Sequence, residues 1–219
     1  ITEVVLVRNG TINSAKLSSI IYAKNYLKIK EIILDKNIGL SKALNIAIEQ
    51  ASSEWLVRFD SDDISVKNRF EFIQNKISEY GTKYDVFGTF INEFIDENKK
   101  RIMIRKVPLE FKKIKSKLFQ MNPMNHVTVF FKRSITFNHN EKSFYPYIDG
   151  FEDYALWVKL ISSGYKFKNF SEITVLVRVG NNMLKRRGGL SYLLKEIKLR
   201  KYMLKYAKGF QILETLIFF

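Results

Sequence analysis

Three carboxylates lie within four positions in the stretch "EWLVRFDSDDIS" (residues 54–65): Asp60, Asp62 and Asp63. Like charges this close repel one another, so a cation bound between them would stabilise the arrangement. Carboxylate oxygens on a turn are ligands that suit Mg²⁺ or Mn²⁺, with water and substrate phosphates completing the coordination shell. The alternative is a polar turn that caps a following helix, where Asp is also common. The spacing therefore predicts a divalent-metal site or a helix cap.

Composition argues against other metal sites. The chain has no Cys and only two histidines, His126 and His139, which is a poor donor set for zinc. The Gly and the distal Glu of a helix–loop–helix calcium loop are missing at the required spacing. Mn²⁺ or Mg²⁺ is therefore the expected cofactor.

A second group of carboxylates, Asp149, Glu152 and Asp153, precedes an apolar helical pattern in "YIDGFEDYALW" (147–157). The N-terminus of a helix attracts negative charge, so a structural role accounts for them by default. The aromatic residues of the same stretch allow a second interpretation. A carboxylate partly shielded by aromatic rings can have a raised pKa and accept a proton from a sugar hydroxyl.

The first half of the chain predicts alternating strands and helices that would position the Asp turn. Short runs rich in β-branched residues predict strands at 3–7, 31–35 and 54–60, and apolar residues at helical spacing predict helices at 13–25 and 39–53. This alternation predicts a right-handed, parallel α/β sheet. The carboxylates from Asp60 to Asp63 would then follow the carboxyl end of a central strand, where open α/β sheets bind ligands. A further helix is expected at 66–80, with Ser65 as its cap.

The second half of the chain has a mixed pattern. Strands are expected at 85–96, 126–134 and 173–179, and helices at 108–119, 151–164 and from Leu190 to Lys208. A loop rich in aromatic and polar residues, 136–150, precedes the helix that carries Glu152 and Asp153. We expect one nucleotide-type half and one substrate-type half within a single domain.

Charge is concentrated in two segments of a strongly basic chain, which carries a formal net charge of +15 over 219 residues. Residues 99–117 and 185–208 each hold nine Lys or Arg against a single Glu. Two local basic patches predict anionic partners at particular places, unless both are simply solvated faces. We see no secretory signal and no apolar run near the roughly 20 residues that span a bilayer, so we expect a soluble or peripheral protein.

The basic helix at the C-terminal end has two unequal apolar strips. Its larger strip lies on one side and its smaller strip lies opposite. Packing on the domain and docking on an anionic membrane are both compatible with this pattern. The larger strip consists of Leu190, Leu193, Leu194, Ile197 and Leu204, and the smaller one of Tyr192, Leu199 and Met203.

These motifs resemble a known enzyme family. "NIGLSKALNIAIEQASSEWLVRFDSDDISVKNRF" is similar to the donor half of family 2 glycosyltransferases, which have the GT-A fold. "NHVTVFFKRS", "GFEDYALWVKLISSG" and "VLVRVGNNMLKRRGG" resemble the acceptor half, particularly in members that build bacterial polysaccharides. An Asp-x-Asp motif alone is weak, but the Asp turn followed by the Glu-Asp helix in family order is specific.

The resemblance implies a role for each matching residue. Asp62 would bind the divalent metal that bridges the donor diphosphate, with Asp60 on the metal or the ribose and Asp63 supporting the turn. Asp153 would be the base that activates the acceptor hydroxyl, with Glu152 beside it. The remaining residues expected to contact the nucleotide sugar are Asn37, Lys42 and Asn45 on the nucleotide, and Arg178, Arg186 and Arg187 near the diphosphate or acceptor. His126 has no settled family role, and a structural role is expected for it.

The resemblance also implies a domain organisation. We expect a GT-A-like catalytic domain at 1–180, with a nucleotide-sugar half at 1–98 and an acceptor half at 99–180, followed by a basic helical extension at 181–219. Its sheet should be mostly parallel and flanked by helices, with a mixed second half. Members of the family usually have a further strand before the point where this sequence begins, and many carry acidic residues at the positions of Arg8 and Asn9.

The leading interpretation is an inverting, metal-dependent glycosyltransferase that transfers a sugar from a nucleotide-sugar donor to a glycan or lipid-diphosphate-linked acceptor in cell-surface polysaccharide synthesis. It would act in the cytoplasm, with its basic patches facing anionic lipid at the inner membrane surface. One alternative is a sugar-phosphate nucleotidyltransferase, which also places a metal-binding Asp turn after an α/β strand. The other is a nucleic-acid-binding module, although no binding motif or aromatic stacking platform is recognisable and no nucleic-acid partner is expected.

Overall fold

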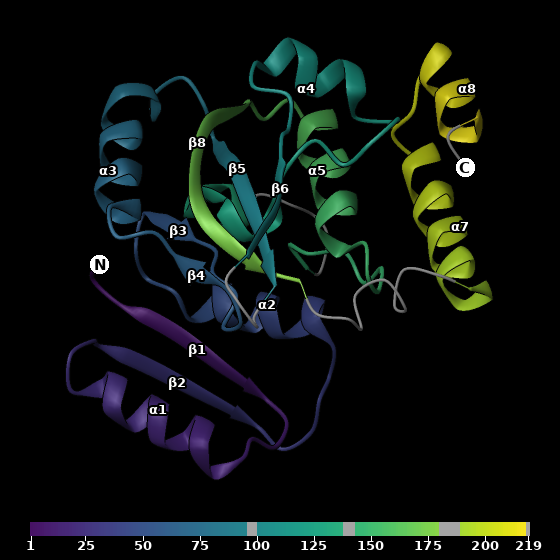
Figure 1. Ribbon diagram of the computed structural model, residues 1–219. Helices are drawn as coiled ribbons and strands as arrows, with labels where there is room; N and C mark the ends of the chain where they lie inside the picture. Colours follow the sequence, from purple (N-terminus) through teal and green to yellow (C-terminus); the bar gives the residue numbers. More distant parts are fainter. Residues whose placement is uncertain (96–99, 138–142, 180–188, 218–219) are drawn as a thin grey trace.

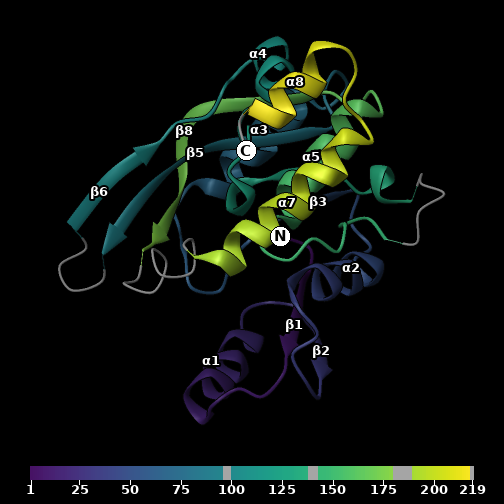
Figure 2. The ribbon, with the colours of Figure 1, turned by 90° about the vertical axis from the view of Figure 1, so that its right-hand side faces the viewer.

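The chain folds into two sheets with helices packed against them in the computed structural model, which describes residues 1–95, 100–137, 143–179 and 189–217 (Figures 1 and 2). The N-terminal strands β1 (Val4–Asn9) and β2 (Ile29–Leu34) form a two-stranded parallel sheet. Helix α1 (Ser14–Lys24) connects them and begins after Asn13, whose side chain accepts a 3.0 Å hydrogen bond from the Lys16 amide. These three elements match the expected first strand–helix–strand unit.

The second sheet has six strands. Three of them, β3, β5 and β8, run in the same direction, because β7 is antiparallel to both β3 and β5 while β8 is parallel to β5. The order is β3 (Trp55–Val57), β7 (Phe130–Lys132), β5 (Val86–Ile95), β8 (Phe167–Arg178) and β4 (Ile64–Ser65), with β6 (Lys100–Arg105) paired to β5.

This sheet is more mixed than the expected, mostly parallel one. The strands that share a direction are those whose connections contain helices, as parallel pairing requires. The short strands β4, β6 and β7 run against their neighbours, and β6 reaches β5 as an antiparallel partner close in sequence. The strand β3 pairs with β7, whereas β1 pairs with β2, so the first three expected strands lie in two sheets among the described residues.

Helices cover both faces of the larger sheet (Figure 1). On one face, α3 (Arg69–Tyr80) packs Ile73 against Phe87, Phe130 and Phe170. On the other, α5 (Glu152–Ser162) is almost wholly buried, and its Trp157 is fully enclosed. The remaining helices are α2 (Leu40–Gln50), α4 (Phe111–Lys117), α7 (Leu190–Leu204) and α8 (Phe210–Ile217).

Several boundaries differ from those expected. Ser65 is not a helix cap: it lies in β4 opposite Val175, and α3 begins only at Arg69. Pairing of residues 64–65 with β8 removes them from the helix. Of the strand expected at 126–134, residues His126–Thr128 form a 3₁₀ turn and only Phe130–Lys132 pair in the sheet. No described helix is long and apolar enough to cross a membrane.

Glu3 links the smaller sheet to the segment that enters β3. Its carboxylate Oε1 accepts hydrogen bonds from the Ser52 amide (2.7 Å), the Ser52 hydroxyl (2.8 Å) and the Ser53 amide (3.1 Å). The Ser52 amide, which is the main cause, and the other donors lower the pKa of Glu3 to about 2. The charged form of this carboxylate therefore stabilises the folded chain.

We expect Glu3→Gln to destabilise the protein in a pH-dependent way. Because the folded pKa is depressed, the wild-type contribution is fully present above the unfolded pKa, near 4.5, and is lost as the pH falls toward about 2. Urea denaturation of both proteins at pH 7 and at successively lower pH should show a stability difference that shrinks on acidification. A difference independent of pH would contradict this assignment.

Candidate active site

The Asp turn lies between β3 and β4 and is held by arginines. Asp60 forms an ion pair with Arg58, and the Asp63 amide donates to the Asp60 carbonyl at 3.2 Å, which closes the turn. Arg178, at the end of β8, reaches the same turn: its Nε donates to the Asp62 carbonyl at 3.0 Å, and its amide donates to Asp63 Oδ1 at 3.1 Å. The structure thus brings Arg178 beside the Asp turn, at which the metal and diphosphate are expected.

The three carboxylates of the turn have different surroundings. Asp63 is half-buried, and desolvation, followed by repulsion from Asp60 and Asp62, raises its pKa to about 6 even though the Arg178 amide opposes the shift. Asp62 is exposed, and Asp60 is partly exposed. Asp63 therefore supports the turn from inside, while Asp60 and Asp62 present carboxylate oxygens toward solvent.

A buried arginine below the turn was missed by the sequence analysis. Arg69, at the start of α3, is completely buried and donates from Nη2 to the carbonyls of Arg58 (2.7 Å) and Val127 (3.1 Å). Burial lowers its pKa to about 10, so it remains cationic at neutral pH. Its guanidinium lies 5.4 Å from the ring centroid of Phe59. Arg69 fixes the backbone that leads into Asp60, but its position in an ordinary helical pattern gave no signal of this role.

The second pair of carboxylates begins α5. Glu152 is buried, and its Oε2 accepts a 2.9 Å hydrogen bond from the Gly150 amide, which folds the preceding loop onto the helix. Asp153 Oδ2 accepts a 2.8 Å hydrogen bond from Asn122 Nδ2. Desolvation raises the pKa of both carboxyl groups above their ordinary values, although the Asn122 hydrogen bond opposes this shift at Asp153. A raised pKa suits a carboxylate that accepts a proton near neutral pH.

Tyr145 is a buried tyrosine in the loop before α5. Its hydroxyl lies 2.8 Å from His126 Nε2. Burial raises the pKa of Tyr145 and lowers that of His126 well below its usual value, so both side chains are neutral at pH 7. The charge of Arg58 opposes this increase in the pKa of Tyr145, whereas the charges of Asp153, Glu152 and Asp60 add to it.

His126 therefore has a structural setting, as expected. Its ring contacts Tyr145 and meets the ring of Trp157 edge-on at 6.0 Å between centroids.

Asn45 joins α2 to the loop before α5. Its Nδ2 donates to the Tyr145 carbonyl (3.1 Å), and its Oδ1 accepts from the Tyr145 amide (2.8 Å). Asn45 is buried, and both ends of its amide are occupied in this way. This geometry favours a role in positioning the loop before α5 over the expected direct contact with a nucleotide.

The other described residues expected on the nucleotide, Lys42 and Asn37, lie on α2 and in the segment between β2 and α2. Lys42 is exposed on α2, with its Nζ 5.9 Å from the ring centroid of Tyr147. Asn37 is exposed after β2, and its Oδ1 accepts from Asn9 Nδ2 (3.1 Å) and from the Gly39 amide (2.9 Å). Arg186 and Arg187 lie outside the described residues.

Within the described ranges, no group of three or more His, Cys, Asp or Glu side chains is arranged to hold a metal ion. The donors that fit a hard divalent cation are the carboxylate of Asp62, which is exposed, and that of Asp60, which also pairs with Arg58. Asp63 is less accessible and accepts a hydrogen bond from the Arg178 amide. Two carboxylates suit Mg²⁺ or Mn²⁺ in sites where substrate phosphates complete the shell. The site therefore fits a cation that binds together with a phosphate ligand.

Comparison with known proteins decides the family. The sequence profile of Glycosyl transferase family 2 matches residues 2–140, which is more than half of the chain. The chain belongs to this family. The expected GT-A-like α/β fold and the expectation of a transferase are thereby confirmed, and the nucleotidyltransferase alternative is not supported.

Two relatives are similar over most of this glycosyltransferase. One is an Escherichia coli UDP-Gal:alpha-D-GlcNAc-diphosphoundecaprenol beta-1,3-galactosyltransferase, 35% identical over 90% of this chain and 70% of its own length. The other is the amylovoran biosynthesis glycosyltransferase AmsE of Erwinia amylovora, 31% identical over 94% of this chain and 74% of its own.

Solved structures agree on the fold of this glycosyltransferase. S. aureus TarS 1–349 in complex with UDP-GlcNAc superposes with a TM-score of 0.68 at 17% identity over 97% of this chain. The mannosyltransferase PcManGT of Pyrobaculum calidifontis, with GDP-Man and Mn²⁺, superposes with a TM-score of 0.58 at 13% identity over 99% of this chain. The chain spans 60% and 64% of these two solved chains, respectively.

Proposed function

We propose that this family 2 glycosyltransferase is an inverting enzyme that transfers a sugar from a nucleoside-diphosphate sugar to a lipid-diphosphate-linked glycan in cell-surface polysaccharide synthesis. The observation that carries the proposal is the presence of two separate carboxylate groups: an exposed Asp turn held by Arg178, and the shielded Asp153 in the first turn of α5. One group suits a diphosphate with its cation, and the other suits a base.

The donor site is proposed at the Asp turn. Asp62 and Asp60 would hold Mn²⁺ or Mg²⁺, which would offset charge on the leaving diphosphate. Arg178 would add positive charge at the same place, since its Nε is already fixed on the Asp62 carbonyl. The solved mannosyltransferase neighbour with GDP-Man and Mn²⁺ is consistent with such a site. Lys42 and Asn37 are proposed at the nucleotide, and Arg186 and Arg187 near the diphosphate or acceptor.

The acceptor site is proposed at the N-terminus of α5. Asp153 would take the proton of the attacking hydroxyl, while the Asn122 hydrogen bond fixes which oxygen faces the substrate. Glu152 holds the loop through Gly150 and so positions Asp153. A single direct displacement inverts the anomeric centre, by the same geometric logic as in inverting glycoside hydrolysis.

The lipid-linked acceptor is proposed from the relatives. The E. coli relative has diphosphoundecaprenol-linked GlcNAc as its acceptor, and the Erwinia relative is named for biosynthesis of the polysaccharide amylovoran. The two-half organisation, with a donor half at 1–98, an acceptor half at 99–180 and a helical extension at 181–219, is part of the same proposal.

Product analysis tests the proposed function. The protein should be incubated with Mn²⁺, a synthetic lipid-diphosphate-linked GlcNAc and a panel of UDP- and GDP-sugars, followed by mass spectrometry and determination of the anomeric configuration by NMR. We expect one nucleotide sugar to give a product heavier by one sugar residue, with the anomeric configuration opposite to that of the donor. Retained configuration, or transfer to water alone across the panel, would contradict the proposal.

A further inference from the structure

The smaller apolar strip of α7, not the larger one, packs against the domain. Leu199 and Met203 of the smaller strip are almost completely buried in the main core. Arg200, on the same side, donates from Nη1 to the Phe119 carbonyl at 3.0 Å. The larger strip faces away from the domain, and the exposed fractions of its side chains are 71% for Leu190, 42% for Leu193, 53% for Leu194 and 38% for Leu204.

Helix α8 also turns its apolar side outward. Its polar residues face the protein: Thr215 is buried, and Glu214 accepts a 2.7 Å hydrogen bond from Gln120 Nε2. A helix on the surface of a water-soluble domain normally has the opposite orientation, with its apolar side buried. Both helices lie at the right-hand edge of the molecule in Figure 1 and face the viewer in Figure 2. The exposed apolar residues of α8 are Ile212, Leu213, Leu216 and Ile217.

Lysines surround this apolar surface, whereas its acids turn inward. Residues 190–217 contain only two acidic side chains: Glu196 pairs with Arg200 of the same helix, and Glu214 bonds to Gln120. Four lysines of α7 and of the turn before α8 are exposed instead: Lys198, Lys201, Lys205 and Lys208.

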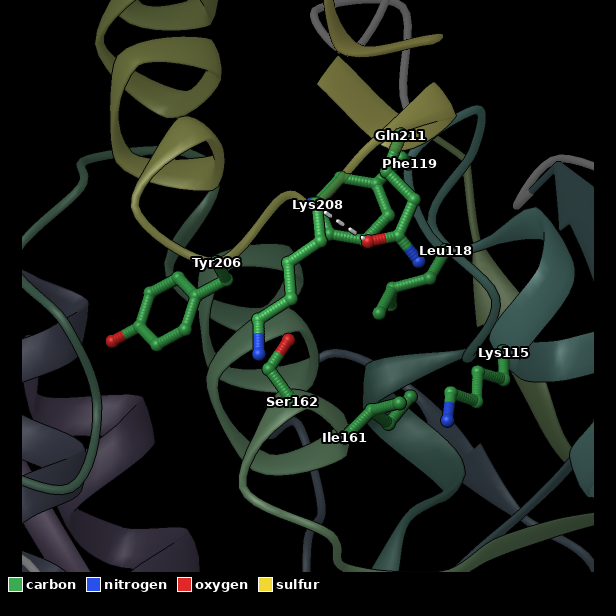
Figure 3. A pocket seen from close by; sticks show the side chains of 8 residues that line it. All are labelled: Lys115, Leu118, Phe119, Ile161, Ser162, Tyr206, Lys208 and Gln211. Carbon is green, nitrogen blue, oxygen red and sulfur yellow. Dashed lines mark hydrogen bonds between the residues drawn. The ribbon is translucent and has the colours of Figure 1, made fainter.

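A pocket lies where this surface meets the other basic segment, residues 99–117. It has a volume of about 320 Å³ and lies between α4, α5 and the turn before α8 (Figure 3). Lys115 of α4 and Lys208 approach it from opposite sides, and the Lys208 amide donates to Gln211 Oε1 at 3.1 Å. The two basic segments, separated in the sequence, therefore meet at one edge of the outer surface. The rest of the lining is Leu118, Phe119, Ile161, Ser162 and Tyr206.

The inner side of α7 contacts the loop that precedes Asp153. Lys195 Nζ forms a 2.6 Å ion pair with Asp149, and the ring of Tyr192 lies 5.2 Å from that of Phe151 between centroids. A surface bound to the outer side of α7 would therefore lie one helix away from the proposed acceptor site.

We propose that the outer face of α7 and α8 docks on an anionic lipid bilayer. The apolar strips would enter the interface between head groups and acyl chains, and the lysines would attract the anionic head groups. This charge pattern complements a membrane better than it complements a second copy of this basic chain, since two copies would bring like charges together. Docking on this face would also present a lipid-linked acceptor to Asp153, a consequence that rests on the proposed function. The docking itself does not depend on that function.

Vesicle sedimentation of the 219-residue chain tests the docking surface. We expect binding to vesicles of phosphatidylcholine with phosphatidylglycerol, little binding to phosphatidylcholine alone, and weaker binding at higher salt. The double variant Lys198→Glu/Lys201→Glu should bind anionic vesicles at least roughly tenfold more weakly than wild type, because each lysine near an anionic surface contributes to binding. Lys16→Glu/Lys28→Glu, on exposed residues in and near α1, makes the same change in net charge and should bind like wild type.

A second pair of variants tests the apolar part of the surface. Leu193→Gln/Leu194→Gln should reduce vesicle binding severalfold, whereas Ile21→Gln, at a 57% exposed position on α1, should not. Circular dichroism checks that each variant is folded.

Three results would overturn the proposal. The first is no binding to anionic vesicles, and the second is an equal loss of vesicle binding in the lysine variant and its α1 control. The third is a wild-type dimer in light scattering that the leucine variant converts to a monomer without a change in vesicle binding. None of these measurements needs catalysis, so the docking surface and the proposed function can fail separately.

Discussion

Asp153→Asn is expected to reduce turnover by roughly 10²- to 10⁴-fold, the contribution typical of a general base. The asparagine keeps the size of the side chain and an oxygen that can accept the hydrogen bond from Asn122, so the position of the residue should be retained. It loses the ability to take a proton. Because the donor site is formed by other elements, the affinity for the nucleotide sugar should change little, and the loss should be in kcat. Steady-state kinetics with donor and acceptor varied separately would measure this.

The pH dependence gives an independent readout. Burial raises the pKa of Asp153, so the basic form becomes available only as the pH rises through that raised value. The kcat of the wild type should therefore increase with pH over this range, and Asp153→Asn should lose this dependence along with the rate.

Glu152→Gln is the matched control, because it can still accept from the Gly150 amide and should cost much less turnover. Near-normal turnover in a folded Asp153→Asn variant would show that the base lies elsewhere. The next candidate would be Asp149, which is exposed and paired with Lys195.

Local pattern in the sequence was sufficient to predict most elements and both carboxylate groups. The first strand–helix–strand unit follows from β-branched runs and helical periodicity, and the placement of the Asp turn after β3 follows from the same rule. The expectation that this strand would be central was wrong, because β3 lies at the edge of the larger sheet among the described residues. Arg58 also stands out in the sequence, as the charge that interrupts the apolar run between Trp55 and Phe59, and the structure pairs it with Asp60. Features that depend on neighbours in sequence were therefore accessible without a structure.

Long-range contacts were not accessible in this way. Nothing around Asn45 indicates that both ends of its amide would bind the backbone of a residue 100 positions later. The same holds for β7, a short strand that separates β3 from β5.

The two strips of α7 show the limit most directly, because the sequence did not indicate which of them would pack on the domain. The smaller strip is buried because Leu199 and Met203 join the main hydrophobic core, a fit that periodicity does not encode.

Asp62→Ala is expected to abolish the effect of metal on nucleotide binding. In the wild type, Mn²⁺ or Mg²⁺ should tighten the binding of UDP or GDP relative to EDTA, because the cation links the Asp60 and Asp62 carboxylates to the diphosphate. Loss of a group that hydrogen-bonds to a metal ligand typically costs roughly 10–100-fold in metal affinity, so loss of a direct ligand should cost at least this much. Isothermal titration calorimetry of wild type and variant, each with metal and with chelator, measures the effect.

Asp63→Asn separates a metal ligand from a carboxylate that only supports the turn. Asp63 Oδ1 accepts from the Arg178 amide, and an asparagine oxygen can accept the same hydrogen bond. Desolvation and the neighbouring carboxylates already disfavour the charged form of Asp63, so the removal of its charge should leave the turn intact. We therefore expect Asp63→Asn to keep the metal-dependent gain in nucleotide affinity that Asp62→Ala loses. Equal loss in both variants would show that Asp63 is also a metal ligand. If the wild type binds the nucleotide equally well with metal and with chelator, the donor site does not use a cation.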